Sequence, residues 1–303
     1  MAKTDELLSI LAAQKINIHF QPIITANGQA IFAYEALSRG PADSSLCSPI
    51  QLFNEAKRQQ QLFALESICR RKAIEQFTQQ QLPGKLFINI TPETLLQPDH
   101  YKGLTLDLIN NFGLRPEQVV IEITEHSPTD DYALMCHAVK HYQGEGFSID
   151  LDDLGAGYSS LRLWSEVQPE YVKIDRHFIS GIEKDKVKRD FVRSIVEIAR
   201  AVKSQVIAEG IETRQEFETL SEIGVDYLQG YYFARPNPEP RHELSKTAKN
   251  VWKQIKEGRE VYKEQGQIGQ LKLDIPAVTP EMLVEEVATI FDENEHWFSV
   301  AVV

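Results

Sequence analysis

The sequence has few cysteines, no long apolar run and no excess of basic residues. Its three cysteines, Cys47, Cys69 and Cys136, lack the spacing of a zinc site, which indicates free thiols in a reducing compartment. The chain has 32 Lys and Arg against 44 Asp and Glu, and this balance argues against a general nucleic-acid-binding protein. No apolar stretch approaches the roughly 20 residues that span a bilayer. We therefore expect a cytoplasmic protein with no membrane segment in this chain.

Two common hydrolase signatures are also missing. The eight histidines do not cluster with the spacing of zinc ligands or of a catalytic triad. No G-x-S-x-G nucleophile elbow occurs. These absences argue against a zinc hydrolase and a serine hydrolase.

Short strand-like segments alternate with helix-like segments along most of the chain. The predicted strands are rich in β-branched and aromatic residues and cover 16–24, 30–38, 85–90, 118–124, 147–152, 171–174, 205–208 and 227–233. The T-A-N-G sequence between the first two predicts an antiparallel hairpin. The alternation predicts an α/β fold, a TIM-like (β/α)8 barrel with an antiparallel first hairpin. An open doubly wound sheet fits less well, because no glycine-rich phosphate loop follows the first strand.

Polar residues recur at the ends of these predicted strands. They are Glu35, Asn89, Glu122, Asp152, Asp153, Lys173, Glu209, Glu212 and Gln229. Barrel enzymes assemble their active sites from the carboxyl ends of the strands, so the pattern predicts one site at one rim. The oxygen ligands among these residues suit hard divalent cations. For any single carboxylate a surface charge or a helix cap is the alternative, and Lys173 could pair structurally with a carboxylate such as Asp175.

Seven motifs, in order, resemble the EAL family of cyclic di-GMP phosphodiesterases. They are E-A-L-S-R, N-I-T-P-E, E-I-T-E, D-D-L-G-A-G-Y-S-S-L, K-I-D, E-G-I-E and Q-G-Y-Y-F, and the resemblance covers roughly residues 5–238. The family's D-D-F-G reads D-D-L-G here, which is a conservative departure. The resemblance implies metal-dependent hydrolysis of cyclic di-GMP to linear 5′-pGpG by an activated water, in bacterial second-messenger signalling.

The resemblance also implies roles for individual residues. Two Mg²⁺ or Mn²⁺ ions would be held by Glu35, Asn89, Glu122, Asp152, Asp153 and Glu209. The residues expected to serve catalysis are Glu35, Lys173, Glu209 and Glu212, of which Glu212 would brace the loop 153–160. The residues expected to contact substrate are Gln21, Arg39, Gln229 and Pro236. Helices between Asp153 and Val202 would form a homodimer contact.

Two other functions remain open. The same fold could be a catalytically silent cyclic di-GMP receptor, although every family ligand position is filled here. A barrel enzyme of the enolase type would use Lys173 to abstract a proton beside Mg²⁺, but its second base is not evident. Metal-dependent release of pGpG would separate the phosphodiesterase from both.

The end of the chain differs from the rest. Residues 241–268 read as a charged helical linker after a barrel domain at 1–240. Residues 269–303 resemble the first half of a CBS module, with Thr279-Pro280 at a helix start. The chain stops inside the apolar run F-S-V-A-V-V, so we expect an engineered truncation within a second domain.

Overall fold

The strands form a closed eight-stranded barrel in sequence order. The computed structural model describes residues 3–27, 30–95, 103–124, 132–154 and 160–243. The strands are β1 Asn17–Thr25, β2 Ile31–Arg39, β3 Lys85–Ile90, β4 Val119–Thr124, β5 Ser148–Leu154, β6 Tyr171–Ile174, β7 Gln205–Ala208 and β8 Tyr227–Leu228. β1 pairs antiparallel with β2 and with β8, and the other neighbours pair in parallel. The predicted barrel and its antiparallel first hairpin are confirmed.

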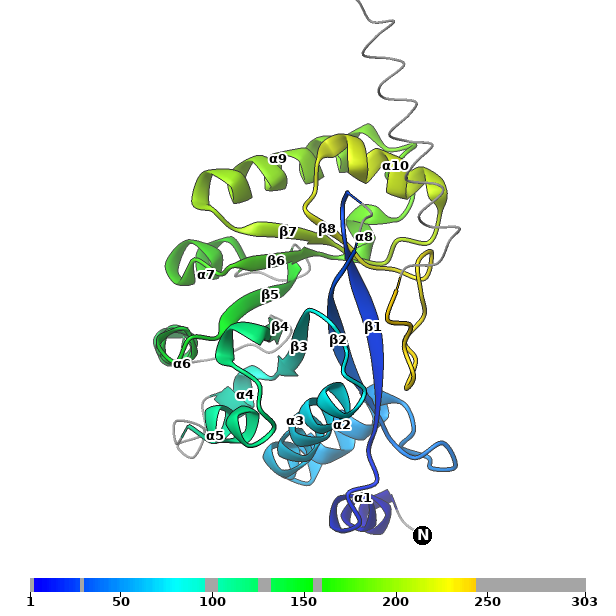
Figure 1. Ribbon diagram of the computed structural model, residues 1–303, viewed down its shortest axis with the longest axis vertical. Helices are drawn as coiled ribbons and strands as arrows, with labels where there is room; N and C mark the ends of the chain where they lie inside the picture. Colours follow the sequence, from blue (N-terminus) through cyan, green and yellow to red (C-terminus); the bar gives the residue numbers. More distant parts are fainter. Residues whose placement is uncertain (1–2, 28–29, 96–102, 125–131, 155–159, 244–303) are drawn as a thin grey trace, which may run out of the picture. The chain divides into compact units, whose positions relative to one another are not determined.

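Helices lie around the outside of the strands (Figure 1). They are α1 Lys3–Ala12, α2 Pro49–Arg58, α3 Leu62–Gln79, α4 Pro92–Leu95, α5 Leu104–Asn111, the 3-10 helix η2 Pro116–Gln118, α6 Tyr132–Gly144, α7 Ser160–Val167, α8 Arg176–Ile179, α9 Lys186–Val202 and α10 Arg214–Ile223. Local sequence sets several starts: Pro49 opens α2, Asp185 caps α9, and Thr213 forms a capping box with Glu216 on α10. Among the described residues, no helix is long and apolar enough to cross a membrane.

Aromatic residues fill the barrel interior below the polar strand ends. The rings of Phe32 and Tyr227 stack with their centroids 3.9 Å apart, and the ring of Tyr171 lies 5.5 Å from that of Phe87. Phe87 precedes Asn89 by two residues, and Tyr171 precedes Lys173 by two. Alternate residues of a strand share a face, so the aromatic layer lies directly beneath the polar layer. An apolar floor therefore supports the polar groups at the carboxyl end.

Two elements are shorter in the structure than the sequence predicts, one helix and one strand. The helical pattern over 55–79 is interrupted between α2 and α3, where Gln60 has a φ of 56°. The strand predicted over 227–233 ends at Leu228, because the chain turns at Gly230. A Cβ at Gly230 would lie 2.1 Å from the Ile211 carbonyl oxygen. This close approach folds the end of β8 over the loop after β7.

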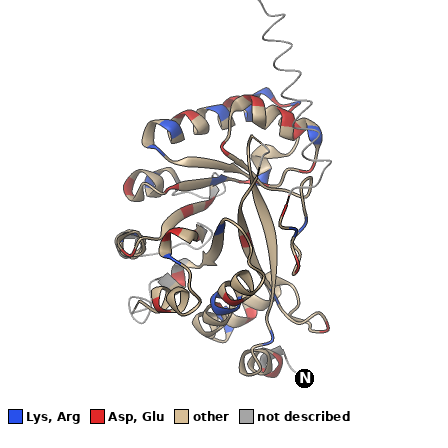
Figure 2. Ribbon diagram, in the orientation of Figure 1, with Lys and Arg blue, Asp and Glu red and all other residues tan. Residues whose placement is uncertain are grey.

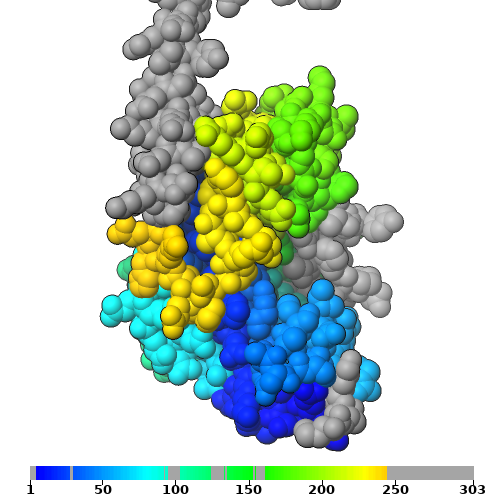
Figure 3. Space-filling model, turned by 90° about the vertical axis from the view of Figure 1, so that its right-hand side faces the viewer, coloured from blue at the N-terminus to red at the C-terminus, as the bar shows by residue number. Residues whose placement is uncertain are grey.

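The segment after β8 runs beside the first strand. The Phe20 N–H donates to the Asn237 carbonyl at 2.8 Å, and the Tyr34 hydroxyl donates to the Arg241 carbonyl at 2.6 Å. Figure 3 shows this segment, in yellow, on the surface beside the blue first strands. The described residues all belong to one compact unit, Met1–Asn250. The predicted linker after Glu243 and the predicted CBS-like segment lie outside the described residues, so the proposed domain boundaries stay predictions.

Candidate active site at the carboxyl end of the barrel

The strand register brings polar residues from neighbouring strands together at the carboxyl end of the barrel. Glu35 on β2 lies opposite Gln21 on β1. Asn89 on β3 lies beside Glu122 on β4, which in turn lies beside Asp150 on β5. Figure 2 shows acidic residues on the barrel strands as well as charges of both signs over the helices. Residues distant in sequence therefore meet at one end of the barrel.

The ammonium group of Lys173 is the centre of this cluster. Its Nζ lies 2.7 Å from Glu122 Oε1, 2.8 Å from Glu209 Oε1 and 3.3 Å from Glu35 Oε2. Asp150 Oδ2 is 3.9 Å away. The Lys173 side chain is fully buried, and so are those of Glu122 and Asp150. A buried lysine needs such partners, because an isolated buried charge is very costly.

Three amide side chains complete the surroundings of Glu35. Asn89 Nδ2 donates to Glu35 Oε1 at 3.2 Å, and Gln229 Nε2 donates to Glu35 Oε2 at 2.6 Å. Gln229 Nε2 also lies 3.3 Å from Gln21 Oε1, while Gln21 Nε2 donates to the Ala234 carbonyl. The amides thus fix the orientation of the Glu35 carboxylate.

Burial and neighbouring charges both shift the pKa values of this cluster. Burial alone would lower the pKa of Lys173, but the charges of Glu122, Glu209 and Glu35 raise it well above its usual value. Burial raises the pKa of Glu35, yet Lys173 and the amide donors bring it below its usual value. Burial raises the pKa values of Glu122 and Glu209 well above normal, with added repulsion from neighbouring carboxylates. The cluster holds more acidic groups than one ammonium neutralises.

Some buried oxygens of the cluster have no hydrogen-bond partner among the described residues. Glu122 Oε2 and Gln229 Oε1 are examples. Within the same residues no group of three or more His, Cys, Asp or Glu is arranged around a point that could take a metal ion. The carboxylates converge on the Lys173 ammonium instead. The donor set nevertheless consists of oxygens, has surplus negative charge and contains unsatisfied oxygens, and these properties fit a hard divalent cation.

The cluster opens into a cleft of about 280 Å³. Its described lining residues are Gln21, Glu35, Leu37, Asp152, Arg176, Glu209, Gly210, Glu212, Gln229, Gly230 and Tyr231. A neighbouring cavity of about 580 Å³ shares Glu35, Leu37 and Asp152 and extends past Arg39 and Asn89 towards α2 and α3. The predicted substrate contacts Gln21, Gln229 and Arg39 therefore line connected space.

Other predicted residues lie at the edge of this space or outside what the structure describes. The side chain of Asp153 and residues 155–159 are outside the described part, so the proposed brace from Glu212 is untested. Glu212 Oε1 instead pairs with Arg176 at 2.9 Å. The pairing of Lys173 with Asp175 is wrong, because the Asp175 carboxylate caps α8 by accepting the His177 N–H. The described lining of the cleft does not include Pro236.

Sequence reasoning missed Arg176. It directly follows the K-I-D motif and begins α8 at the carboxyl end of β6. That position after a barrel strand was the available signal, since such positions face the active-site rim.

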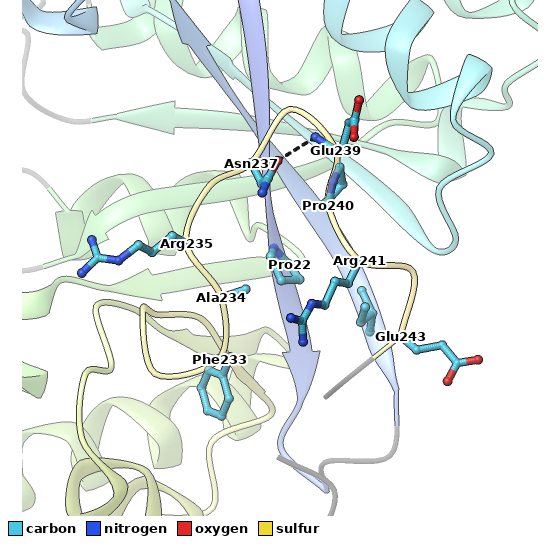
Figure 4. A pocket seen from close by; sticks show the side chains of 10 residues that line it. Pro22, Phe233, Ala234, Arg235, Asn237, Glu239, Pro240, Arg241 and Glu243 are labelled. Carbon is cyan, nitrogen blue, oxygen red and sulfur yellow. Dashed lines mark hydrogen bonds between the residues drawn. The ribbon is translucent and has the colours of Figure 1, made fainter. Parts of the chain in front are cut away.

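A separate hollow, of about 370 Å³, lies between the segment after β8 and the first hairpin (Figure 4). Phe233, Asn237 and Arg241 line it from the segment, and Pro22 lines it from β1. The Glu239 N–H donates to Asn237 Oδ1 at 2.9 Å, the hydrogen bond drawn in Figure 4. None of the described residues that line it belongs to the Lys173 cluster.

Comparison with known proteins places this architecture in a family. The model of the EAL domain matches residues 4–236. The "Probable cyclic di-GMP phosphodiesterase PdeB" of Escherichia coli (strain K12) is 31% identical over 229 residues, which are 74% of this chain and 43% of that protein. The chain thus spans less than half the length of this relative.

Solved structures agree with the sequence comparison. A standalone versatile EAL protein from Vibrio cholerae O395, in its c-di-GMP bound form, is 29% identical with a TM-score of 0.68. The match covers 77% of this chain and 97% of that one. Klebsiella pneumoniae BlrP1, in a calcium and cy-diGMP complex, is 30% identical with a TM-score of 0.67, covering 74% of this chain and 56% of that one. The Lys173 cluster thus belongs to a barrel of known type, and the chain is a member of the EAL-domain family.

Proposed function

We propose that this chain hydrolyses cyclic di-GMP to linear 5′-pGpG with the help of two divalent cations. The observation that carries the proposal is the buried cluster of Glu35, Glu122, Glu209 and Lys173 at the carboxyl end of an EAL-domain barrel. The named relative PdeB and the c-di-GMP bound Vibrio structure support the choice of substrate.

The residues proposed to hold the ions are Glu35, Asn89, Glu122, Asp152, Asp153 and Glu209. When bound, Mg²⁺ or Mn²⁺ supplies Lewis acidity towards a phosphodiester and a nucleophilic water. The fit rests on the oxygen-only donors, on the surplus negative charge and on the unpartnered Glu122 Oε2. Complexes of BlrP1 with calcium or manganese support a divalent cation in this family.

The chain's own residues would orient the reactants. The Lys173 ammonium would hold the attacking water and stabilise negative charge on the phosphoryl oxygens. Gln229 and Asn89 would keep the Glu35 carboxylate in place, as their hydrogen bonds to it indicate. In the reaction a new bond forms between phosphorus and the water oxygen, the bond from phosphorus to the 3′ oxygen breaks, and that oxygen takes a proton.

The proposed homodimer is supported by an exposed apolar stripe on α9. Val187, Phe191, Ile198 and Val202 are exposed there, while Val192, Ile195, Val196 and Ala199 on the adjoining face are buried. Val187 is 77% exposed, and the four side chains together leave an apolar patch uncovered. A second copy of the chain would cover this stripe, in the region between Asp153 and Val202.

Chromatography of cyclic di-GMP incubated with the protein and Mn²⁺ tests the proposal. We expect pGpG with Mn²⁺ and no product with EDTA. Asn89→Ala should reduce turnover at least tenfold, because it removes a proposed metal ligand and a hydrogen bond to Glu35. Asn111→Ala, at an exposed residue ending α5, should leave turnover unchanged. Tight binding of intact cyclic di-GMP without any product would instead support the receptor function.

A further inference from the structure

Arg176 is held at the rim of the cleft by two contacts. Its aliphatic stem crosses Gly210, where an added Cβ would lie 2.5 Å from the Arg176 Cγ. Its guanidinium pairs with Glu212 Oε1 at 2.9 Å. Gly210 and Glu212 both belong to the loop after β7, so this one loop contacts both the aliphatic stem and the guanidinium of Arg176. The side chain remains 56% exposed, which leaves the guanidinium accessible from the cleft.

The described lining of the cleft carries more negative than positive charge. Among the described residues that line it, Arg176 is the only one with a positive charge, against Glu35, Asp152, Glu209 and Glu212. The Lys173 ammonium is fully buried and shared by Glu122, Glu209 and Glu35. A phosphate group that binds in the cleft outside the Lys173 cluster would therefore be repelled by carboxylates unless Arg176 contacts it.

Arg39 and Arg176 follow opposite parts of the barrel. Arg39 ends β2 and lines the neighbouring cavity, whereas Arg176 follows β6. β2 and β6 are four strands apart in a closed barrel of eight, so their ends lie across the mouth from each other. The proposed substrate has two phosphodiester groups, of which one reacts at a time.

We propose that Arg176 binds the second, non-reacting phosphate of cyclic di-GMP and thereby selects a substrate with two phosphodiesters. This inference rests on the proposed function. A guanidinium presents five N–H donors in a planar fork that matches phosphate oxygens. Glu212 Oε1 pairs with one terminal nitrogen of this guanidinium, so the other donors are already oriented when the ligand arrives.

The test compares two substrates on Arg176→Gln and Arg176→Lys. Cyclic di-GMP has two phosphodiesters, and bis(p-nitrophenyl) phosphate has one. For Arg176→Gln we expect the KM for cyclic di-GMP, and its Kd by calorimetry with Ca²⁺, to rise about 10- to 100-fold, as for the loss of a charged hydrogen bond. The KM for bis(p-nitrophenyl) phosphate and both kcat values should change less than about twofold, and Arg176→Lys should restore part of the affinity.

Arg214→Gln is the matched control, because Arg214 is 47% exposed and pairs with Glu218 at 2.7 Å on α10. It should leave both substrates unaffected. An equal loss on both substrates, or no loss on cyclic di-GMP, would overturn the role of Arg176. If the unaltered protein neither binds nor cleaves cyclic di-GMP, the proposed function fails and this inference fails with it. If it does both and Arg176→Gln matches it, only this inference fails.

Discussion

Replacing Lys173 with methionine should unfold the barrel more easily when divalent cations are absent. The lysine is fully buried and lies within 3.3 Å of three carboxylate groups, so the change leaves Glu35, Glu122 and Glu209 without their common cation. Removing one partner of a buried ion pair costs about 3–5 kcal/mol. For a domain of this size that corresponds to a fall in melting temperature of roughly 6–20 °C.

The assay is thermal unfolding of both proteins, first with EDTA and then with excess Mn²⁺. We expect Lys173→Met to melt well below the unaltered protein in EDTA. Mn²⁺ should restore much of the difference, because a cation that binds the folded state stabilises it by mass action. We expect Lys173→Met to hydrolyse no cyclic di-GMP even with Mn²⁺, since the group proposed to orient the water is missing. Equal melting temperatures in EDTA would refute the conclusion that Lys173 neutralises the cluster.

Three further substitutions test other parts of the structure. Burial raises the pKa of Glu66 to about 7, so its protonated form stabilises the folded protein at low pH and this contribution is lost as the pH rises towards 7. The glutamine of Glu66→Gln does not titrate, so the free energy of unfolding of this variant, relative to that of the unaltered protein, should rise by about 2–3 kcal/mol from pH 5 to pH 8. Urea unfolding at both pH values measures this difference, and a difference that does not change with pH would contradict the assignment. If the proposed dimer forms through α9, Phe191→Asp should convert it into a monomer, measured by light scattering, and a mass unaffected by the change would argue against the α9 contact. Gly210→Ala, at a φ of 68° and against the Arg176 stem, should cost about 1–3 kcal/mol and weaken cyclic di-GMP binding. Unchanged stability and binding would show that Gly210 does not position Arg176.

The barrel could be predicted because its signals are local. The Asn-Gly turn predicts the first hairpin, and short runs such as Val119–Ile121 predict strands buried on both faces. The register then follows from the fold, and it places Asn89 beside Glu122 as the strand-end pattern requires. The ends of elements were harder to predict: the break at Gln60 has no sequence signal, and β8 is short because Gly230 packs on Ile211.

The partners inside the site could be predicted only in part. Polar strand ends indicate that Glu122, Lys173 and Glu209 share a rim. Which carboxylate meets Lys173 depends on closure of the barrel, which joins β4, β6 and β7 across its interior. From the sequence, the nearby Asp175 was a possible ion-pair partner of Lys173, but its side chain caps α8 instead. The pair of Arg176 and Glu212 was missed for the same reason, since it joins two loops that only the fold brings together.

The most direct test of the account is hydrolysis of cyclic di-GMP in water enriched in ¹⁸O, followed by mass spectrometry of the product. If a water held in the Lys173 cluster attacks phosphorus, the pGpG formed with Mn²⁺ should contain one ¹⁸O atom, located in its 5′ phosphate. No labelled pGpG should form with EDTA. Intact substrate with Mn²⁺, or product without the label, would contradict the central claim that this barrel is a metal-dependent phosphodiesterase.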